Sequence, residues 1–254
     1  MVKVMKNEFL MKQIATIHND FPSKFGIPRQ SGLVKELKAK IVFEPEFRDI
    51  NALRGLEEFT HIWLIWQFSE SIREGFSPTV KPPRLGGNQR MGVFATRSPF
   101  RPNPIGLSCV ELESIEQTKE YGAVLHIAGA DLMDGTPIYD IKPYIPIADC
   151  KQDAIGGFSD QYAQYSLQVD FPQQWLNMIP SDKREALIQV LAQDPRPSYQ
   201  KDNHRIYGLE FADYDVKFTV EGETLTVYSV EARSFTKHEV KWKSSYNDIN
   251  NVSH

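Results

Sequence analysis

The chain has 254 residues, a formal net charge of −4, 24% charged residues and 41% hydrophobic residues. These are ordinary values for a globular protein, and the length suits either one large domain or a main domain with a smaller second one. No run approaches the roughly 18 to 20 apolar residues that span a bilayer, and the first 20 residues lack the apolar segment of a secretory signal. We therefore expect a cytoplasmic protein without a membrane segment.

Short segments rich in β-branched and aromatic residues dominate the first part of the chain and predict strands. They cover residues 12–19, 61–68, 92–96, 107–115, 123–129 and 138–145. Within 107–115, apolar Val110 and Leu112 alternate with Glu111 and Glu113, as a sheet with one solvated face requires. No helix of 10 to 15 residues recurs between these segments, which argues against a doubly wound parallel sheet. The pattern predicts a mostly β fold built on an antiparallel sheet or barrel.

The composition changes after about Cys150, where residues 151–166 are polar and weakly periodic and predict a linker. Residues 181–194 then predict a helix that has Ser181 as its N-cap and ends before a proline. Residues 205–211 predict a strand, and residues 215–232 predict a hairpin that turns near a glycine. We expect a small α+β second domain.

These boundaries give three expected parts. A β-barrel domain covers 1–155, the α+β domain covers 156–243, and a polar tail covers 244–254.

Familiar motifs for nucleotide, zinc or hydrolase chemistry do not occur in the sequence. The six histidines show no pairs at metal-ligand spacing, so no metal site is expected. Cys109 and Cys150 are the two cysteines, and we expect both to be buried, unpaired thiols.

A basic segment stands out in this acidic chain. Residues 75–110 contain no Asp or Glu but carry five cations, which are Lys81, Arg84, Arg90, Arg97 and Arg101. With Phe94 and Phe100 interleaved, this composition suits a phosphate backbone or an anionic ligand. The alternative is an ordinary solvated loop.

Two further clusters carry polar side chains. Arg29 and Gln30 follow a proline before the expected strands, and Asp131, Asp134 and Asp140 surround a glycine. The Asp-Gly pair at 134–135 predicts a hairpin turn. Paired carboxylates could also act as acid–base catalysts or metal ligands, although no histidine accompanies them.

Five segments, in order, carry a resemblance to a known family. They are "PRQSGLVKE", "LRGLEEFTHIWLIWQF", "PPRLGGNQRMGVFATRSPFRPNPIGLS", "DLMDGTPIYDIKPYIP" and "AQDPRPSY". Together they resemble the tRNA threonylcarbamoyladenosine methyltransferase family, of the bacterial kind with a C-terminal extension. The resemblance implies a homodimer that holds S-adenosylmethionine on an antiparallel β-barrel and methylates N6 of threonylcarbamoyladenosine at position 37 of tRNA. It also accounts for the missing dinucleotide-binding motif.

The resemblance also implies a set of cofactor contacts. They are Pro28, Arg29, Gln30, His61, Ile62, Arg97, Leu107, Asp131, Leu132, Met133 and Asp134. Arg29 or Arg97 can pair with the methionine carboxylate, and an acidic side chain near Asp131 can bind ribose hydroxyls or the ammonium group. Leu107 and Ile62 can either form a wall for the adenine or belong to the core.

Methyl transfer from a sulfonium needs an in-line, desolvated nucleophile rather than a strong base. Asn103 is our candidate for accepting a hydrogen bond from the adenine N6–H, by analogy with Asn-Pro elements on other folds, although an Asn in a proline-rich turn is an equally simple interpretation. The tRNA backbone is expected to contact Lys81, Arg84, Arg90 and Arg101.

Two alternatives to a methyltransferase stay open at the sequence level. One is a non-catalytic RNA- or nucleotide-binding barrel that uses the same basic segment. The other is a metal-dependent phosphate hydrolase that uses Asp131, Asp134 and Asp140. The sequence also leaves open whether the segment "DPRPSY" contacts tRNA or packs the two domains together.

Overall fold

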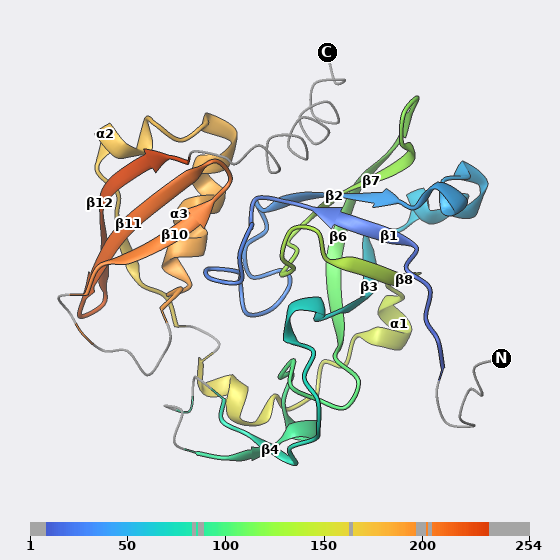
Figure 1. Cartoon of the computed structure of the whole chain (residues 1–254), viewed down its shortest axis with the longest axis horizontal. Coiled ribbons are helices and arrows are strands. Elements are labelled where there is room, and N and C mark those ends of the chain that lie inside the picture. Colours follow the sequence, from blue (N-terminus) through green and yellow to red (C-terminus); the bar gives the residue numbers. More distant parts are fainter. Residues whose placement is uncertain are drawn as a thin grey trace.

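The computed structural model describes residues 9–82, 85, 89–162, 165–196, 202 and 205–233. Its first part is a closed antiparallel β-barrel with the strand order β1-β2-β7-β6-β3-β8 (Figure 1). The strands are β1 (Ala15–His18), β2 (Lys38–Phe43), β3 (His61–Gln67), β6 (Ile105–Thr118), β7 (Gly122–Ala128) and β8 (Pro137–Pro143). The expected antiparallel barrel is confirmed.

Alternation along the strands fills the barrel interior. In β3, Ile62, Leu64 and Trp66 are buried while the residues between them are partly exposed. They pack with buried side chains from every other barrel strand. The predicted strands at 12–19, 61–68, 107–115, 123–129 and 138–145 are confirmed, whereas β2 is an additional strand that the sequence analysis did not predict.

Between β3 and β6 the chain leaves the barrel, and we call residues 69–104 the insertion. It contains 3₁₀ helices at Ser69–Ser71 and Val93–Ala95 and the two-residue strands β4 (Thr79–Val80) and β5 (Met91–Gly92). The predicted strand at 92–96 is therefore wrong. The backbone turns after β5, and the Thr96 hydroxyl donates to the Val93 carbonyl at 2.9 Å, which closes a local turn instead of extending a ladder.

The remaining short helices of the first part lie on connections. Three 3₁₀ helices between β2 and β3 cover Pro45–Phe47, Ile50–Leu53 and Leu56–Glu58. After β8 come α1 (Pro146–Asp149) and a 3₁₀ helix at Gly157–Tyr162. Cys150 follows α1 and is exposed, while Cys109 is partly exposed, so the expectation of two buried thiols is wrong. A four-residue surface helix offers no core for Cys150 to enter.

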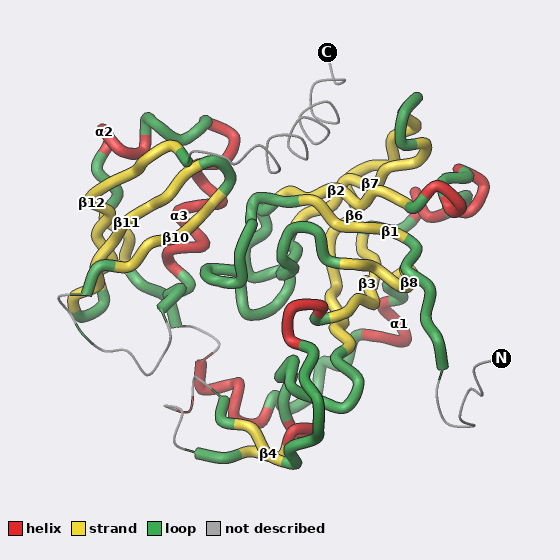
Figure 2. The backbone as a smooth tube through the Cα atoms, in the orientation of Figure 1, coloured by secondary structure: helices red, strands yellow, loops and turns green. Residues whose placement is uncertain are grey.

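The second part is a small α+β domain, as predicted (Figure 2). Its sheet has the order β10-β11-β12-β9, and β9 runs parallel to β12. The strands are β9 (Gln168–Asp170), β10 (Tyr207–Phe211), β11 (Tyr214–Glu221) and β12 (Thr224–Ala232), and the helices are α2 (Gln173–Leu176), a 3₁₀ helix at Ser181–Lys183 and α3 (Arg184–Ala192). The predicted strand and hairpin are confirmed.

The helix predicted at 181–194 is confirmed as α3, but Ser181 is not its N-cap. Ser181 instead begins the 3₁₀ helix after Pro180, and Lys183 precedes α3 without a capping side chain. Buried Leu187 and Leu191 anchor α3 on the sheet.

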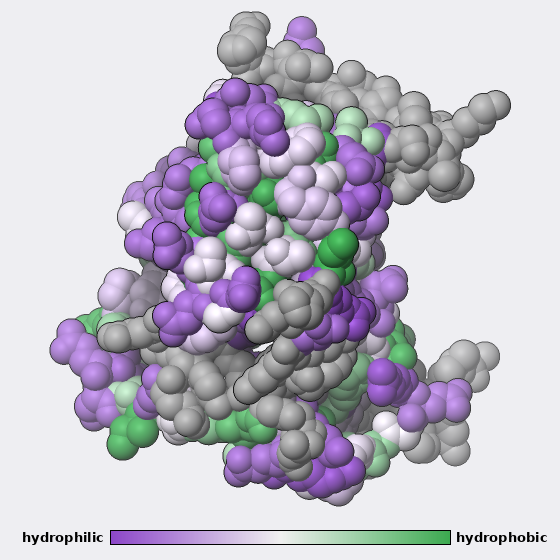
Figure 3. All heavy atoms as spheres, turned by 90° about the vertical axis from the view of Figure 1, so that its left-hand side faces the viewer, coloured by the Kyte–Doolittle hydropathy of each residue, from purple (hydrophilic) through white to green (hydrophobic). Residues whose placement is uncertain are grey.

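Figure 3 shows the side of the molecule that lies on the left in Figure 1. Hydrophilic and intermediate residues cover most of the described surface there, and hydrophobic residues form small separate groups.

The connection between β1 and β2, residues 19–37, belongs to both parts of the molecule and is called the bridging loop. Phe21, Val34 and Leu37 from this loop are buried in the hydrophobic cluster of the second domain. The Asp20 carboxylate pairs with Lys183 Nζ at 2.5 Å. In Figure 1 the loop lies between the barrel and the C-terminal sheet. The domain limits expected from the sequence stay a prediction, because this loop contributes to the second core.

None of the helices in the described residues is long and apolar enough to cross a membrane.

Candidate active site

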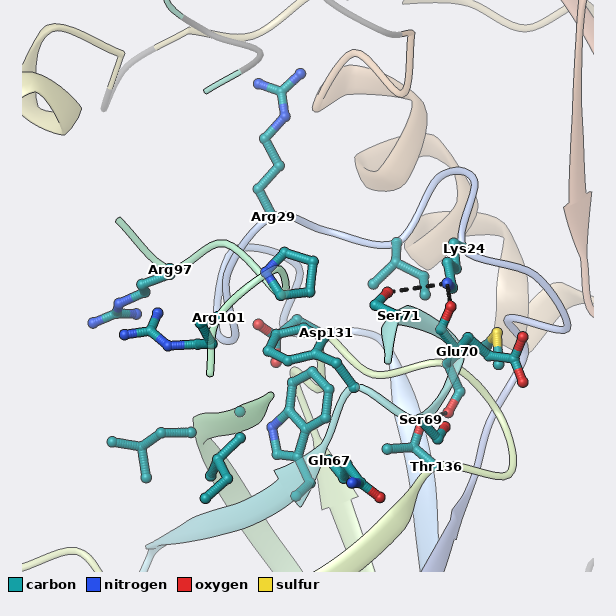
Figure 4. Close-up of a pocket in the computed structure, with 18 of the residues that line it drawn as sticks. Lys24, Arg29, Gln67, Ser69, Glu70, Ser71, Arg97, Arg101, Asp131 and Thr136 are labelled. Atoms are coloured by element: carbon teal, nitrogen blue, oxygen red, sulfur yellow. Dashed lines mark hydrogen bonds between the residues drawn. The ribbon is translucent and has the colours of Figure 1, made fainter. Parts of the chain in front are cut away.

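A cavity of about 590 Å³ opens where the end of β3 and the start of β6 meet the bridging loop, the insertion and the segment before β8 (Figure 4). This volume lies in the usual range for small-molecule sites. Several residues proposed from the sequence line it, namely Pro28, Arg29, Gln30, Arg97, Arg101, Asn103, Leu107, Asp131 and Met133. The complete described lining comes from four stretches of the chain, which are residues 24–30, 66–71, 96–107 and 131–136.

The inner wall of the cavity is a chain of hydrogen bonds across three segments. Trp66 Nε1 donates to Ser108 Oγ at 3.0 Å, and Ser108 Oγ donates to Asp131 Oδ1 at 2.5 Å. Trp66 is 6% exposed and Ser108 is 1% exposed. Because two paired strands hold the donors, the Asp131 carboxylate has a fixed position at the cavity.

Burial raises the pKa of Asp131, although the Ser108 hydroxyl, backbone N–H groups and the charge of Arg97 act in the opposite direction. The ionised carboxylate is thus destabilised relative to the protonated form. A cationic group or a set of hydroxyl donors bound beside Asp131 would favour the ionised form. A partly buried carboxylate with a raised pKa at a cavity is a physical indication of a binding site.

Glycine is required next to this wall. A Cβ on Gly106 would lie 2.2 Å from Cε2 of Trp66, so a side chain at this position would clash with the indole. The Trp66 and Phe68 rings are neighbours, with centroids 4.3 Å apart. The two rings are tilted by 59° against each other and give the cavity an apolar aromatic wall, against which a purine can pack.

Basic side chains surround the rest of the cavity. Arg97 is exposed and donates to Gln30 Oε1. Arg101 is partly buried and donates from Nη1 to the Thr96 carbonyl at 3.0 Å.

The other two cations of the cavity are tied to neighbouring elements. Lys24 donates to the Glu70 carbonyl and to Ser71 Oγ at 2.5 and 3.1 Å, as Figure 4 shows. Arg29 donates to the backbone carbonyl of Asp194, in the second domain, at 3.1 Å. The lining contains the four cations Lys24, Arg29, Arg97 and Arg101 and the two carboxylates Glu70 and Asp131, which gives it an excess of positive charge.

Four residues implied as cofactor contacts lie elsewhere in this chain. His61 and Ile62 begin β3, roughly 20 Å of strand from Gln67, and Ile62 is fully buried in the barrel core. Leu132 is 1% exposed and also packs in that core. The Asp134 carboxylate accepts a hydrogen bond from the Asn19 N–H at 3.0 Å. The described lining of the cavity does not include these four residues, so their role as cofactor contacts stays a prediction.

The residues proposed for tRNA binding separate into two groups. Lys81 and Arg90 are exposed on the insertion, where Arg90 Nη1 donates to Thr79 Oγ1 at 2.8 Å. Arg101 lies in the cavity, and Arg84 lies outside the described residues.

The metal-hydrolase alternative finds no support in the described residues. Asp140 pairs with Lys142 at 2.9 Å, and the part of the chain that the structure describes contains no group of three or more His, Cys, Asp or Glu that could hold a metal ion.

The sequence analysis missed Trp66, Phe68 and Ser108. Trp66 continues the inward alternation of β3 after Ile62 and Leu64, so its position is typical of a core residue. The aromatic ending of "HIWLIWQF" was the available signal.

Family models match both parts of the chain. The tRNA-methyltransferase O N-terminal domain matches residues 16–150, and the C-terminal domain of the same family matches residues 164–233. The chain belongs to the tRNA-methyltransferase O family. The resemblance found in the sequence is thereby confirmed.

Relatives of this family match almost end to end. A tRNA (adenine(37)-N6)-methyltransferase of Escherichia coli (strain K12) is 39% identical over 235 residues, which cover 89% of this chain and 100% of the relative. A putative S-adenosylmethionine-dependent methyltransferase, RcsF, of Pseudomonas aeruginosa is 40% identical over 211 residues, 80% of this chain and 89% of the relative. The crystal structure of TrmO from Pseudomonas aeruginosa is similar with a TM-score of 0.73 and 33% identity, and the match covers 89% of this chain and 99% of that one.

Proposed function

We propose that this protein is an S-adenosylmethionine-dependent methyltransferase that methylates N6 of threonylcarbamoyladenosine at position 37 of tRNA, next to the anticodon. Membership of the family and the activity for which the Escherichia coli relative is named support the reaction. The observation that carries the proposal is the cavity in which a partly buried carboxylate, an aromatic wall and several cations converge.

The chemistry of the lining fits the cofactor. Asp131 would hold its ammonium group or ribose hydroxyls, Arg97 or Arg29 would pair with its carboxylate, and Trp66 with Leu107 would pack on its adenine. When bound, S-adenosylmethionine supplies an electrophilic methyl group on a sulfonium.

The chain's own contribution to the reaction is position and desolvation. The cavity walls would hold the adenine N6 in line at contact distance and displace water from the line of attack. Asn103 lines the cavity between two prolines, and its backbone carbonyl is held by the Ile105 N–H at 2.7 Å. Its side-chain carbonyl would accept a hydrogen bond from the substrate N6–H. Asn103 is exposed, so the proton would pass to solvent as the new C–N bond forms and the methyl–sulfur bond of the sulfonium breaks.

The proposal includes tRNA as the partner, gripped by the exposed cations Lys81 and Arg90 of the insertion. The proposal also includes that the protein forms a homodimer and works in the cytoplasm, and the family resemblance supports both points.

The test is methyl transfer from labelled S-adenosylmethionine to tRNA that carries threonylcarbamoyladenosine, with the product nucleoside identified after digestion. We expect label on N6 at position 37, and an Asp131→Asn variant should transfer far less. Calorimetry should show that S-adenosylmethionine binds while NAD and ATP do not. Tight tRNA binding without cofactor binding or label would instead support the non-catalytic RNA-binding barrel.

A further inference from the structure

A second cavity of about 410 Å³ adjoins the first one. Its lining includes Ile72, Arg73, Glu74, Phe76 and Phe100 of the insertion, and it shares Ser71 and Arg101 with the first cavity. Ser71 and Arg101 therefore form a wall that the two neighbouring cavities share. The cofactor and adenine contacts described above do not use the second cavity.

The proposed reaction requires space of this kind. The methyl group goes to a nitrogen that already carries a threonylcarbamoyl group, so the first atom of that substituent is bonded to the reacting atom. The substituent must then extend from the reaction centre into an adjoining space. It ends in a carboxylate and also carries a hydroxyl, and a subsite for it needs a cation near the reaction centre and polar groups around it.

Arg101 has the position and the donors for this task. It is partly buried at the wall between the two cavities, and its Nη1 donates to the Thr96 carbonyl at 3.0 Å, which fixes its orientation. A guanidinium has five N–H groups in a planar fork, so the bond to Thr96 leaves donors that can take a carboxylate in the bidentate arrangement.

A second arginine, Arg73, also lines the second cavity. The Arg73 guanidinium lies 3.9 Å from the centroid of the Phe100 ring, a cation–π contact that holds it over the aromatic face. Glu74 is the acidic side chain in this lining, so the two arginines leave an excess of positive charge. Such a wall favours an anionic group over a neutral one.

We propose that the second cavity is the subsite for the N6 substituent of the substrate adenosine and that Arg101 binds the carboxylate of that substituent, with Arg73 as the supporting cation. This inference rests on the proposed function and assigns its substrate selectivity to a residue. A site built to hydrogen-bond a polar group rejects analogues that lack the group by orders of magnitude. Arg101 is thus a specificity-determining residue rather than a general contact to the tRNA backbone.

The experiment compares two otherwise identical tRNAs, one with threonylcarbamoyladenosine at position 37 and one with unmodified adenosine. For the wild-type protein we expect kcat/KM to be at least about 100-fold higher for the modified tRNA. Arg101→Ala should lower kcat/KM for the modified tRNA by about 10- to 100-fold and leave the unmodified tRNA almost unchanged. Arg101→Lys keeps the charge but lacks the planar fork of N–H donors. Its kcat/KM for the modified tRNA should fall between those of the wild-type protein and Arg101→Ala.

Matched variants control for charge and folding. Arg54→Ala removes an exposed arginine from the connection between β2 and β3, outside both cavities, and should behave as wild type. S-adenosylmethionine affinity and thermal stability should stay near wild type in Arg101→Ala. An Arg101→Ala variant that loses activity equally on both tRNAs, or that keeps the full preference for the modified one, overturns the inference.

Nucleoside binding separates the inference from the proposed function. Free N6-threonylcarbamoyladenosine should bind the wild-type protein at least about tenfold more tightly than adenosine in calorimetry, and Arg101→Ala should abolish this preference. Absence of methyl transfer together with an Arg101-dependent preference would sink the proposed reaction and leave the subsite standing. Equal binding of the two nucleosides by the wild-type protein would refute the subsite.

Discussion

The inner wall and the insertion face the same cavity but are built in opposite ways. The inner wall consists of Trp66, Gly106, Ser108 and Asp131, which sit on or beside barrel strands, and hydrogen bonds fix its polar atoms. The insertion carries exposed aromatics such as Phe94, which is 73% exposed, and pairs its two strands over two residues each. A small rigid cofactor benefits from a preorganised wall, whereas a tRNA loop needs accessible charge and aromatic faces.

The bridging loop is a third part of the site, and the second domain holds it in place. The backbone carbonyl of Asp194 accepts a hydrogen bond from the Arg29 guanidinium at 3.1 Å. Its carboxylate accepts two hydrogen bonds from Arg196 at 2.8 and 3.0 Å and one from the Tyr165 hydroxyl at 2.9 Å. Within the "DPRPSY" segment, Asp194 therefore contacts the loop that carries Arg29, and Arg196 holds the Asp194 carboxylate in place.

The largest expected effect is on stability, from Asp194→Ala. Asp194 is 8% exposed and adopts a positive φ of 54°, so the variant leaves Arg196 without its partner and places alanine in an unfavourable conformation. We expect the free energy of unfolding to fall by about 2 to 4 kcal/mol in urea denaturation, with weaker S-adenosylmethionine binding as the bridging loop loosens. Asp194→Asn, which tolerates this backbone conformation, should lose clearly less.

The pH dependence of the same carboxylate gives an independent check. Burial acts to raise the pKa of Asp194, but hydrogen bonds from Arg196 and Tyr165 outweigh it and lower the pKa. Because the pKa is lowered, ionised Asp194 stabilises the fold fully above its pKa in the unfolded chain, which is about 4. This stabilisation is lost as the pH falls through the lower pKa of the folded state. The stability difference between wild type and Asp194→Asn should therefore shrink below about pH 4. A difference that stays constant there would contradict this account.

Asp131→Asn should have the next largest effect, on cofactor affinity. Loss of a charged hydrogen-bond partner in the inner wall should raise the Kd for S-adenosylmethionine by about 10- to 100-fold in calorimetry. The pKa of Asp131 is raised in the folded protein, so ionised Asp131 lowers the stability of the wild-type protein as the pH rises from about 4 to this raised pKa. The stability of Asp131→Asn at neutral pH should therefore not fall below that of wild type.

The affinity of the wild-type protein for S-adenosylmethionine should depend on pH in the opposite sense to the effect of Asp131 on stability. A bound ammonium group favours the ionised carboxylate, so S-adenosylmethionine affinity should rise as the pH passes up through the raised pKa of Asp131 and then level off. Asp131→Asn should flatten this rise. An unchanged rise in the variant would assign the titration to another group.

The sequence predicted most of the barrel and only part of the site, for identifiable reasons. Alternation around Val110 and Leu112 predicted β6, whereas five of the six residues of β2 are buried, which removes the alternation that marks a strand. The family resemblance led to Asp131 and Arg97. The bond from Ser108 to Asp131 spans 23 residues and depends on barrel closure, so no local pattern could reveal it. Proline-rich spacing in the insertion likewise indicated rigid turns but not the 3₁₀ helix at Val93–Ala95.

The same substitution in both regions sharpens the contrast. Gly106→Ala places a Cβ against the Trp66 indole, and we expect a loss of about 1 to 3 kcal/mol in stability together with weaker S-adenosylmethionine binding. Gly92→Ala in the insertion is the control, because a Cβ there meets nothing within 4 Å and its φ of −56° suits alanine. Its stability should stay within about 0.5 kcal/mol of wild type. Equal losses in the two variants would mean that the insertion is as tightly packed as the inner wall.

The smallest effect on the fold, and the clearest on RNA, is expected from a Lys81→Ala, Arg90→Ala double variant of the insertion. Both side chains are exposed and lie outside the lining of the cavity, so stability and S-adenosylmethionine affinity should stay at wild-type values. Binding of tRNA should weaken, and the slope of log K against log salt should flatten by roughly 0.7 to 0.9 for each phosphate that the variant no longer neutralises. Arg97→Ala should do the reverse, since it lowers cofactor affinity and leaves the salt slope unchanged. A double variant with the tRNA affinity and salt slope of wild type would show that these two cations are ordinary solvated residues, and the RNA would then have to bind through another surface.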